Sequence, residues 1–298
     1  MNQPKTPTRS RLRRKTAVTV SGTPPQRQLF QAAGLRLLIW GLALLMAAIL
    51  VLPIVGLVWR TVMALGQDLS LDVGPVWSAV WLSLRTTAVS MVLVVLLGTP
   101  LAFLLARADF PGKRALTVFV ELPIVLPPVV AGLALLSAFG RRGLLGAPLT
   151  LLGISIPFTW VAVVLAQVFV AAPFYIRAAQ LRFAALPREL EEAASMDGAD
   201  GWRVFWHVIR PLSSRALAAG LVLSWARALG EFGATILFAG NLQGRTQTMP
   251  LLIYSALERD LNATYVSALI LLALAVLAFG LTRWLAGLDE KDADPLAG

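Results

Sequence analysis

Six long apolar runs constrain this chain more than any other feature of its sequence. They occupy residues 35–59, 79–106, 115–139, 151–176, 213–238 and 262–286. An α-helix rises about 1.5 Å per residue, so about 20 apolar residues cross a hydrocarbon core about 30 Å thick. Every run exceeds that length. The sequence therefore predicts an all-α integral membrane protein with six transmembrane helices.

The composition favours the same class. Charged residues make up 14% of the chain, whereas a soluble domain carries about 25%. The net charge of +10 could indicate a nucleic-acid partner, but many basic residues precede or flank the apolar runs, where they favour membrane topology instead. We therefore expect contact with membrane lipid and none with nucleic acid. The chain has no cysteine and a single histidine, which argues against a metal site or a bound cofactor.

The sequence divides into a polar arm, a transmembrane domain and a short tail. Residues 1–34 are rich in Thr, Pro, Gln, Ser and Arg, which predicts a disordered basic arm. The run 35–59 is too long for a signal peptide, so we interpret it as a retained helix. The transmembrane domain covers residues 35–288, and residues 289–298 form the tail. Lys and Arg are denser in the connections on the side of the arm, which predicts that both termini lie in the cytoplasm.

Residues 182–212 form the longest predicted cytoplasmic connection and carry clear helix signals. Pro187 and the three glutamates that soon follow it suit the first turn of a helix. Gly198 suits the C-terminal end of that helix. Asp200 is a suitable N-cap for a second helix, which Pro211 is expected to end or kink before the fifth apolar run.

The second helix of this connection is expected to be amphipathic. Helical spacing places one set of residues on an apolar stripe, namely Trp202, Phe205, Trp206 and Ile209. The opposite polar face would carry Arg203, His207 and Arg210. An ordinary amphipathic helix at the membrane surface would show the same pattern, so that interpretation stays open.

A longer pattern in this connection resembles a known family. Glu192-Ala193-Ala194, three residues, Gly198, nine residues and Val208-Ile209-Arg210-Pro211 resemble the EAA loop of ABC-importer permeases, whose pattern is E-A-A-x3-G-x9-I-x-L-P. The chain departs from it with Val208 for Ile and Arg210 for Leu. The resemblance implies a coupling helix that docks into a cleft of a separate ATPase subunit. The coupling residues that it implies are Glu192, Ala193, Ala194, Gly198, Ala199 and Pro211.

Further segments resemble the molybdate-permease branch of this family. They are RALGEFGAT (227–235), FAGN (238–241) and GRTQTMPL (244–251), together with residues 122–146 and 166–179. Sulfate/thiosulfate and tungstate permeases share shorter versions, so those substrates remain alternatives.

The resemblance implies a set of partners. It implies a permease homodimer, two copies of an ATPase that uses ATP and Mg²⁺, and an extracytoplasmic oxyanion-binding protein. It also places the chain in a bacterial inner (cytoplasmic) membrane.

Several residues near the membrane interior are candidates for the pathway or its gate. Glu231 lies inside the fifth apolar run, where a carboxylate is costly, and Arg227 lies one turn earlier. The two could form an internal ion pair or lie at a gate or at the dimer interface. Pro127 and Pro128 should kink or break the third run, and a half-helix that starts near Pro128 would direct its positive end to mid-membrane. The complete set is Pro127, Pro128, Arg227, Glu231, Thr235, Asn241 and Arg245.

An enzymatic activity is not expected of this chain. The sequence contains no G-x-x-x-x-G-K-[ST] phosphate-binding loop, so ATP hydrolysis should occur in a partner chain. The main alternative from another class is a secondary transporter or channel that works without an ATPase. Such proteins often have internal repeats and acids in several spans, and the sequence shows no clear repeat.

Overall fold

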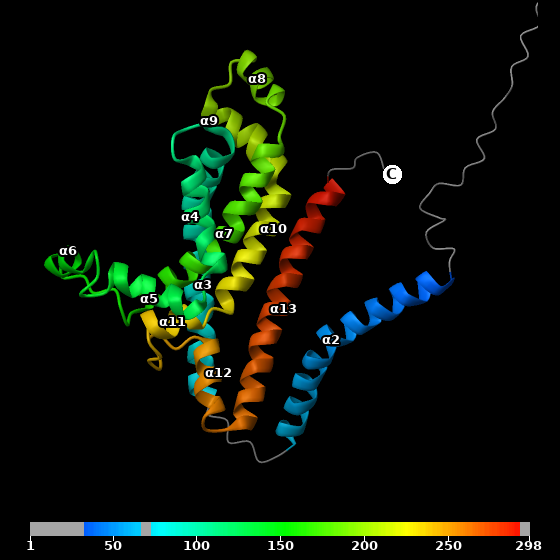
Figure 1. Ribbon diagram of the computed structural model, residues 1–298, viewed down its shortest axis with the longest axis vertical. Coiled ribbons are helices and arrows are strands. Elements are labelled where there is room, and N and C mark those ends of the chain that lie inside the picture. Colours follow the sequence, from blue (N-terminus) through cyan, green and yellow to red (C-terminus); the bar gives the residue numbers. More distant parts are fainter. Residues whose placement is uncertain (1–32, 67–72, 293–298) are drawn as a thin grey trace, which may run out of the picture. The chain divides into compact units, whose positions relative to one another are not determined.

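The computed structural model describes residues 33–66 and 73–292, which form helices and their connections and contain no strand (Figure 1). Most of the predicted arm and the end of the predicted tail lie outside these residues. The chain divides into two units, residues 1–56 and 57–298. Helix α2 (Ala33–Leu65) begins in the first unit, and its apolar side chains are exposed there, as expected of a helix in contact with lipid.

Three helices of the described residues are long and apolar enough to cross a membrane. They are α2, α3 (Val73–Arg107) and α7 (Trp160–Ala185). Helix α5 (Pro128–Phe139) and residues 261–277 of α13 (Leu261–Asp292) are apolar but shorter. The all-helical membrane fold is thus confirmed, while the count of six spans stays a prediction.

The third apolar run is broken, as its prolines predict. Helix α4 (Lys113–Val125) ends at the extended residue Leu126, and α5 begins at Pro128. Because Pro127 and Pro128 have no amide hydrogen to donate, the hydrogen-bond ladder is interrupted here. The half-helix expected to start near Pro128 is therefore present.

The predicted fourth span, residues 151–176, is wrong in its boundaries. Residues 152–159 lie outside any helix and follow the short helix α6 (Gly146–Leu151). Helix α7 begins only at Trp160, where the Thr159 hydroxyl accepts a hydrogen bond from the Ala162 amide at 3.4 Å. The apolar run suggested a longer helix because the segment before Thr159 is apolar although it is not helical.

The predicted fifth span, residues 213–238, is also corrected. Helix α10 (Arg210–Leu229) ends at Gly230, and a separate helix α11 (Gly233–Phe238) follows. Pro211 does not end the preceding helix, because it lies in the first turn of α10, where the missing amide hydrogen costs little. Instead α9 (Gly201–Val204) passes through a π-helical turn (Phe205–Ile209) into α10. A short helix α12 (Met249–Leu257), absent from the prediction, precedes α13.

The core forms where α3, α7 and α10 pack against one another. Leu105, Tyr175, Phe183 and Ala228 are buried in it. The hydroxyl of Ser224 on α10 donates to the Ala171 carbonyl at 2.6 Å and accepts from the Tyr175 amide at 3.0 Å, so one side chain joins the backbone ladder of α7. Helix α8 (Glu189–Met196) and α9 lie at one end of this bundle, and α12 lies at the other (Figure 1).

Candidate functional site

The connection between α7 and α10 contains the predicted pair of short helices. Helix α8 carries three glutamates in its first turn, where the helix dipole favours negative charge. At its end the Ala199 amide donates to the Ala194 carbonyl at 3.0 Å, and Gly198 has a φ of 86°, a left-handed conformation that glycine adopts readily. The Asp200 carboxylate then accepts from the Arg203 amide at 2.8 Å and caps α9. These helix signals of the sequence are confirmed.

Helix α8 presents its residues to two different surroundings. Ala194 of α8, and Ala199 just after the helix, are half-buried and pack against the core between α3, α7 and α10. Glu192 and Ala193 are exposed, and Met196 is 89% exposed. The outward surface of α8 is therefore partly acidic and partly apolar, and Met196 is of a residue type that is enriched at protein interfaces.

An ion pair that sequence reasoning missed holds α8 to the bundle. Arg107, the last residue of α3, pairs with Glu191 and also donates to the Leu186 carbonyl at 3.0 Å. Leu186 precedes α8, so one guanidinium contacts both the start of the connection and the helix. Arg107 therefore ties the connection and α8 directly to the end of α3. No local signal reveals this contact, because the paired residues are far apart in the sequence.

The apolar stripe predicted for the second helix is only partly confirmed. Ile209 is buried and Phe205 packs against the core, but Trp202 is 70% exposed. Arg210 was expected on the opposite face, whereas its guanidinium lies 4.8 Å from the centre of the Trp206 ring. Residues four apart in a helix are neighbours on one face, and an arginine packs favourably on an indole ring.

Glu231 and Arg227 form the internal pair that was one of the two readings of the sequence. Glu231 is 1% exposed, and its carboxylate lies 2.7 Å from the Arg227 guanidinium. Its other oxygen accepts a hydrogen bond from the Ala234 amide at 2.8 Å. Glu231 thus joins the end of α10 to the start of α11 across the break in the fifth run. Both oxygens of the buried carboxylate thus have a partner, as an ionised group in a protein interior requires.

The two short half-helices α5 and α11 pack closely through glycines. A Cβ atom on Gly233 would lie 2.4 Å from the Pro128 side chain, and one on Gly132 would lie 2.9 Å from that of Leu237. Only a hydrogen atom fits at each position. Thr235 of α11 is completely buried. The contact of Gly233 with Pro128 thus brings the start of α5, at Pro127 and Pro128, against α11, the helix that carries Thr235 and follows Glu231.

The remaining candidates, Asn241 and Arg245, lie in the connection between α11 and α12. The Asn241 side chain donates to the Ser255 hydroxyl of α12 at 2.7 Å. Arg245 is exposed and lines a small cavity beside α3. The structure thus separates the candidates into three places: the α8–α9 connection, the junction of the half-helices, and the α11–α12 connection.

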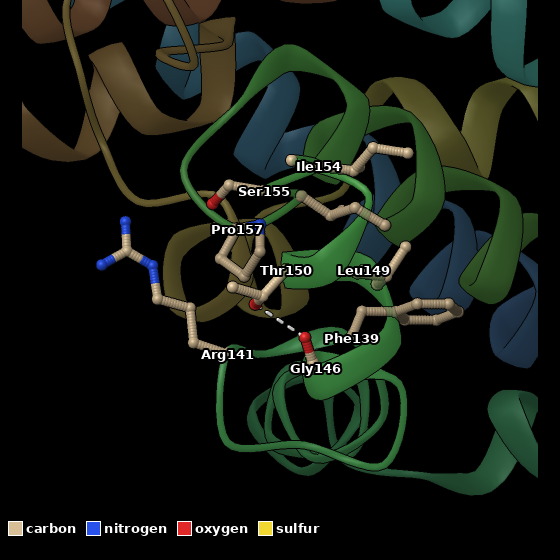
Figure 2. Close-up of a pocket in the computed structure, with 10 residues that line it drawn as sticks. Phe139, Arg141, Gly146, Leu149, Thr150, Ile154, Ser155 and Pro157 are labelled. Carbon is tan, nitrogen blue, oxygen red and sulfur yellow. Dashed lines mark hydrogen bonds between the residues drawn. The ribbon is translucent and has the colours of Figure 1, made fainter.

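A further cavity of about 290 Å³ lies around α6 (Figure 2). Its lining is mostly apolar, and the Thr150 hydroxyl within it donates to the Gly146 carbonyl at 2.7 Å. The guanidinium of Arg141 points away from the other labelled side chains in Figure 2. This cavity therefore does not gather charged groups around one point.

Comparisons with known proteins cover most of the chain. The family model "binding-protein-dependent transport system inner membrane component" matches residues 98–287. The molybdenum transport system permease protein ModB of Mycobacterium tuberculosis is 46% identical over 67% of this chain and 76% of its own length. The protein of the same name from Escherichia coli K12 is 39% identical over 74% of this chain and 97% of its own length. A sulfate transport system permease protein, CysW of Synechococcus elongatus, is 40% identical over 65% of this chain and 68% of its own length.

Solved structures share the fold at low sequence identity. A bacterial ABC transporter that imports alginate superposes with a TM-score of 0.65 at 15% identity, over 87% of this chain and 98% of that one. The methionine ABC transporter MetNI, in an inward-facing conformation, gives a TM-score of 0.56 at 19% identity, over 70% of this chain and 93% of that one.

Proposed function

This chain belongs to the family of binding-protein-dependent transport system inner membrane components, and on that premise we propose that it imports molybdate. It is the permease subunit of an ABC transporter. The observation that carries the choice of substrate is its identity of 39% to 46% with molybdenum permeases, in one case over 97% of the relative's length. Sulfate is the second candidate, because a sulfate permease is 40% identical over a shorter share of its length.

The partners follow from the same proposal. Two copies of the chain form the pathway, a separate ATPase subunit hydrolyses ATP with Mg²⁺, and an extracytoplasmic protein delivers the oxyanion. Both termini and the α8–α9 end of the bundle lie in the cytoplasm, and α12 lies at the outer side. We keep in this proposal the domain limits predicted from the sequence, which are residues 35–288 for the permease domain and residues 289–298 for the tail.

The ATPase would dock on the α8–α9 connection. The contact residues are Glu192, Ala193, Ala194, Gly198, Ala199 and Pro211. Exposed Met196 would add an apolar side chain to this surface, and the Arg107–Glu191 pair would link a movement of the surface to α3. The Arg227–Glu231 pair and the packed half-helices would move as one body when the pathway opens.

Uptake in cells distinguishes molybdate from sulfate. A strain that depends on this permease, and from which the gene is then deleted, should lose molybdate uptake at low external concentration. Sulfate uptake should persist in the same cells. Loss of sulfate uptake with normal molybdate uptake would contradict the substrate while leaving the permease assignment intact. Complementation by the intact gene is the control.

A further inference from the structure

Two arginines line one small cavity at the end of the bundle that carries α12. Arg85 of α3 and Arg245 of the α11–α12 connection border a space of about 260 Å³, together with Thr86, Trp160 and Gly244. A water molecule occupies about 30 Å³ in the liquid, so the cavity has room for a five-atom oxyanion and several waters. Arg85 is not among the candidates predicted from the sequence, because the cavity joins residues that are far apart in the chain.

The backbone around Arg245 is held in place against α3. The amides of Arg245, Thr246 and Gln247 all donate to the Leu242 carbonyl, at 2.8–3.0 Å. Thr246, Thr248 and Met249 are buried, and the Met249 amide donates to the Ser83 hydroxyl of α3 at 2.8 Å. Arg245 therefore projects from a fixed turn, and its position relative to Arg85 is set by the fold.

Neither guanidinium has a carboxylate partner among the described residues. Arg107, Arg177 and Arg227 each form an ion pair there, whereas Arg85 and Arg245 form none. Arg85 is exposed although it lies within α3, one of the helices able to span a membrane. A charged residue in a span faces the protein interior or a water-filled path rather than lipid. The surface of α3 around Arg85 should accordingly face the pathway.

We propose that Arg85 and Arg245 bind the transported oxyanion in this cavity, an inference that rests on the function proposed above. A tetrahedral dianion offers acceptor oxygens on every side, and each guanidinium offers several fixed donors. Two positive charges balance the charge of the anion. The site lies at the outer side in the proposed topology, so it receives the oxyanion from the binding protein before the pathway opens inward. A transport site must release its ligand as well, and two exposed arginines bind less firmly than an enclosed cage.

The test uses the whole complex, reconstituted in proteoliposomes with its ATPase and with binding protein loaded with molybdate. Molybdate transported per ATP hydrolysed is compared between the wild type, Arg85→Gln and Arg245→Gln. Each variant should lower this ratio at least tenfold. The matched control is Arg259→Gln, because Arg259 lines a different cavity that also contains Asp260. The control should keep the ratio of the wild type.

Two results would overturn the proposal. An unchanged ratio in both variants would do so, including a proportional fall of uptake and hydrolysis, which would indicate a contact with the binding protein. A defect that appears in vesicles containing phosphatidylglycerol but not in pure phosphatidylcholine would assign the arginines to a lipid headgroup. The double variant Arg85→Lys/Arg245→Lys keeps both positive charges. If it retains the full ratio while the Gln variants lose it, the result supports an anion site. If instead the wild-type complex takes up no molybdate, the proposed function itself fails.

Discussion

Gly198 determines the shape of the surface proposed for ATPase docking. Its φ of 86° ends α8 and turns the chain into α9. A Cβ atom there would meet no other atom within 4 Å, so the protomer itself has space for a side chain. What a side chain would disturb is the left-handed backbone, at a cost of about 1–2 kcal/mol, and any surface that docks on it.

We expect Gly198→Asp to insert into the membrane normally but to lose coupling. Hydrolysis of ATP stimulated by loaded binding protein should fall at least tenfold in the reconstituted complex, because the added side chain separates closely packed surfaces. Gly112→Asp is the matched control, since Gly112 has a φ of 88°, equal space and no part in α8. If Gly198→Asp keeps both stimulated hydrolysis and the ATPase subunit on purification, the connection is not the docking site.

The buried carboxylate of Glu231 illustrates what single residues can and cannot predict. Its place in an apolar run marked it as important, and its neighbour four residues earlier made an ion pair one of the expected outcomes. The hydrogen bond from the Ala234 amide depends on the helix break at Gly230. That break could not be predicted, because the run is apolar on both sides of it.

At the scale of elements, local backbone chemistry was predictable and tertiary placement was not. The break at Pro127 and the caps at Gly198 and Asp200 follow from local chemistry: proline donates no amide hydrogen, glycine adopts a left-handed conformation readily, and an aspartate side chain caps a helix. Helix α12 was missed because a window of about 19 residues averages over a helix of nine. The start of α7 was misplaced because hydropathy reports burial in lipid and carries no information on hydrogen bonding.

The contact between α5 and α11 provides a test at this scale. Gly233→Ala would place a methyl group against Pro128, a ring that cannot change its rotamer, so the half-helices must separate. We expect a loss of about 1–3 kcal/mol, typical of overpacking, and an apparent Tm several degrees lower for the purified protein. Gly230→Ala is the control, because its nearest contact would be the Ala226 carbonyl at 3.6 Å. Equal melting of both variants would contradict the close packing.

For the whole molecule, the sequence predicted the class, and the structure supplied the contacts between distant elements. Apolar runs and the EAA pattern were sufficient to predict a helical permease, which the family comparison confirms. The Arg107–Glu191 pair and the cavity shared by Arg85 and Arg245 could not be predicted from the sequence, because each joins elements that come together only in the folded chain. The order of charged residues along the sequence does not show which of them pair across the helix bundle.

The central claim is that this permease moves an oxyanion only when a separate ATPase and a binding protein act on it. Its most direct test is molybdate uptake into proteoliposomes that contain the wild-type permease and the ATPase, with ATP inside and loaded binding protein outside. Uptake should stop when ATP, the ATPase or the binding protein is omitted. Uptake at an undiminished rate by the permease alone would contradict it and would identify a secondary transporter or channel.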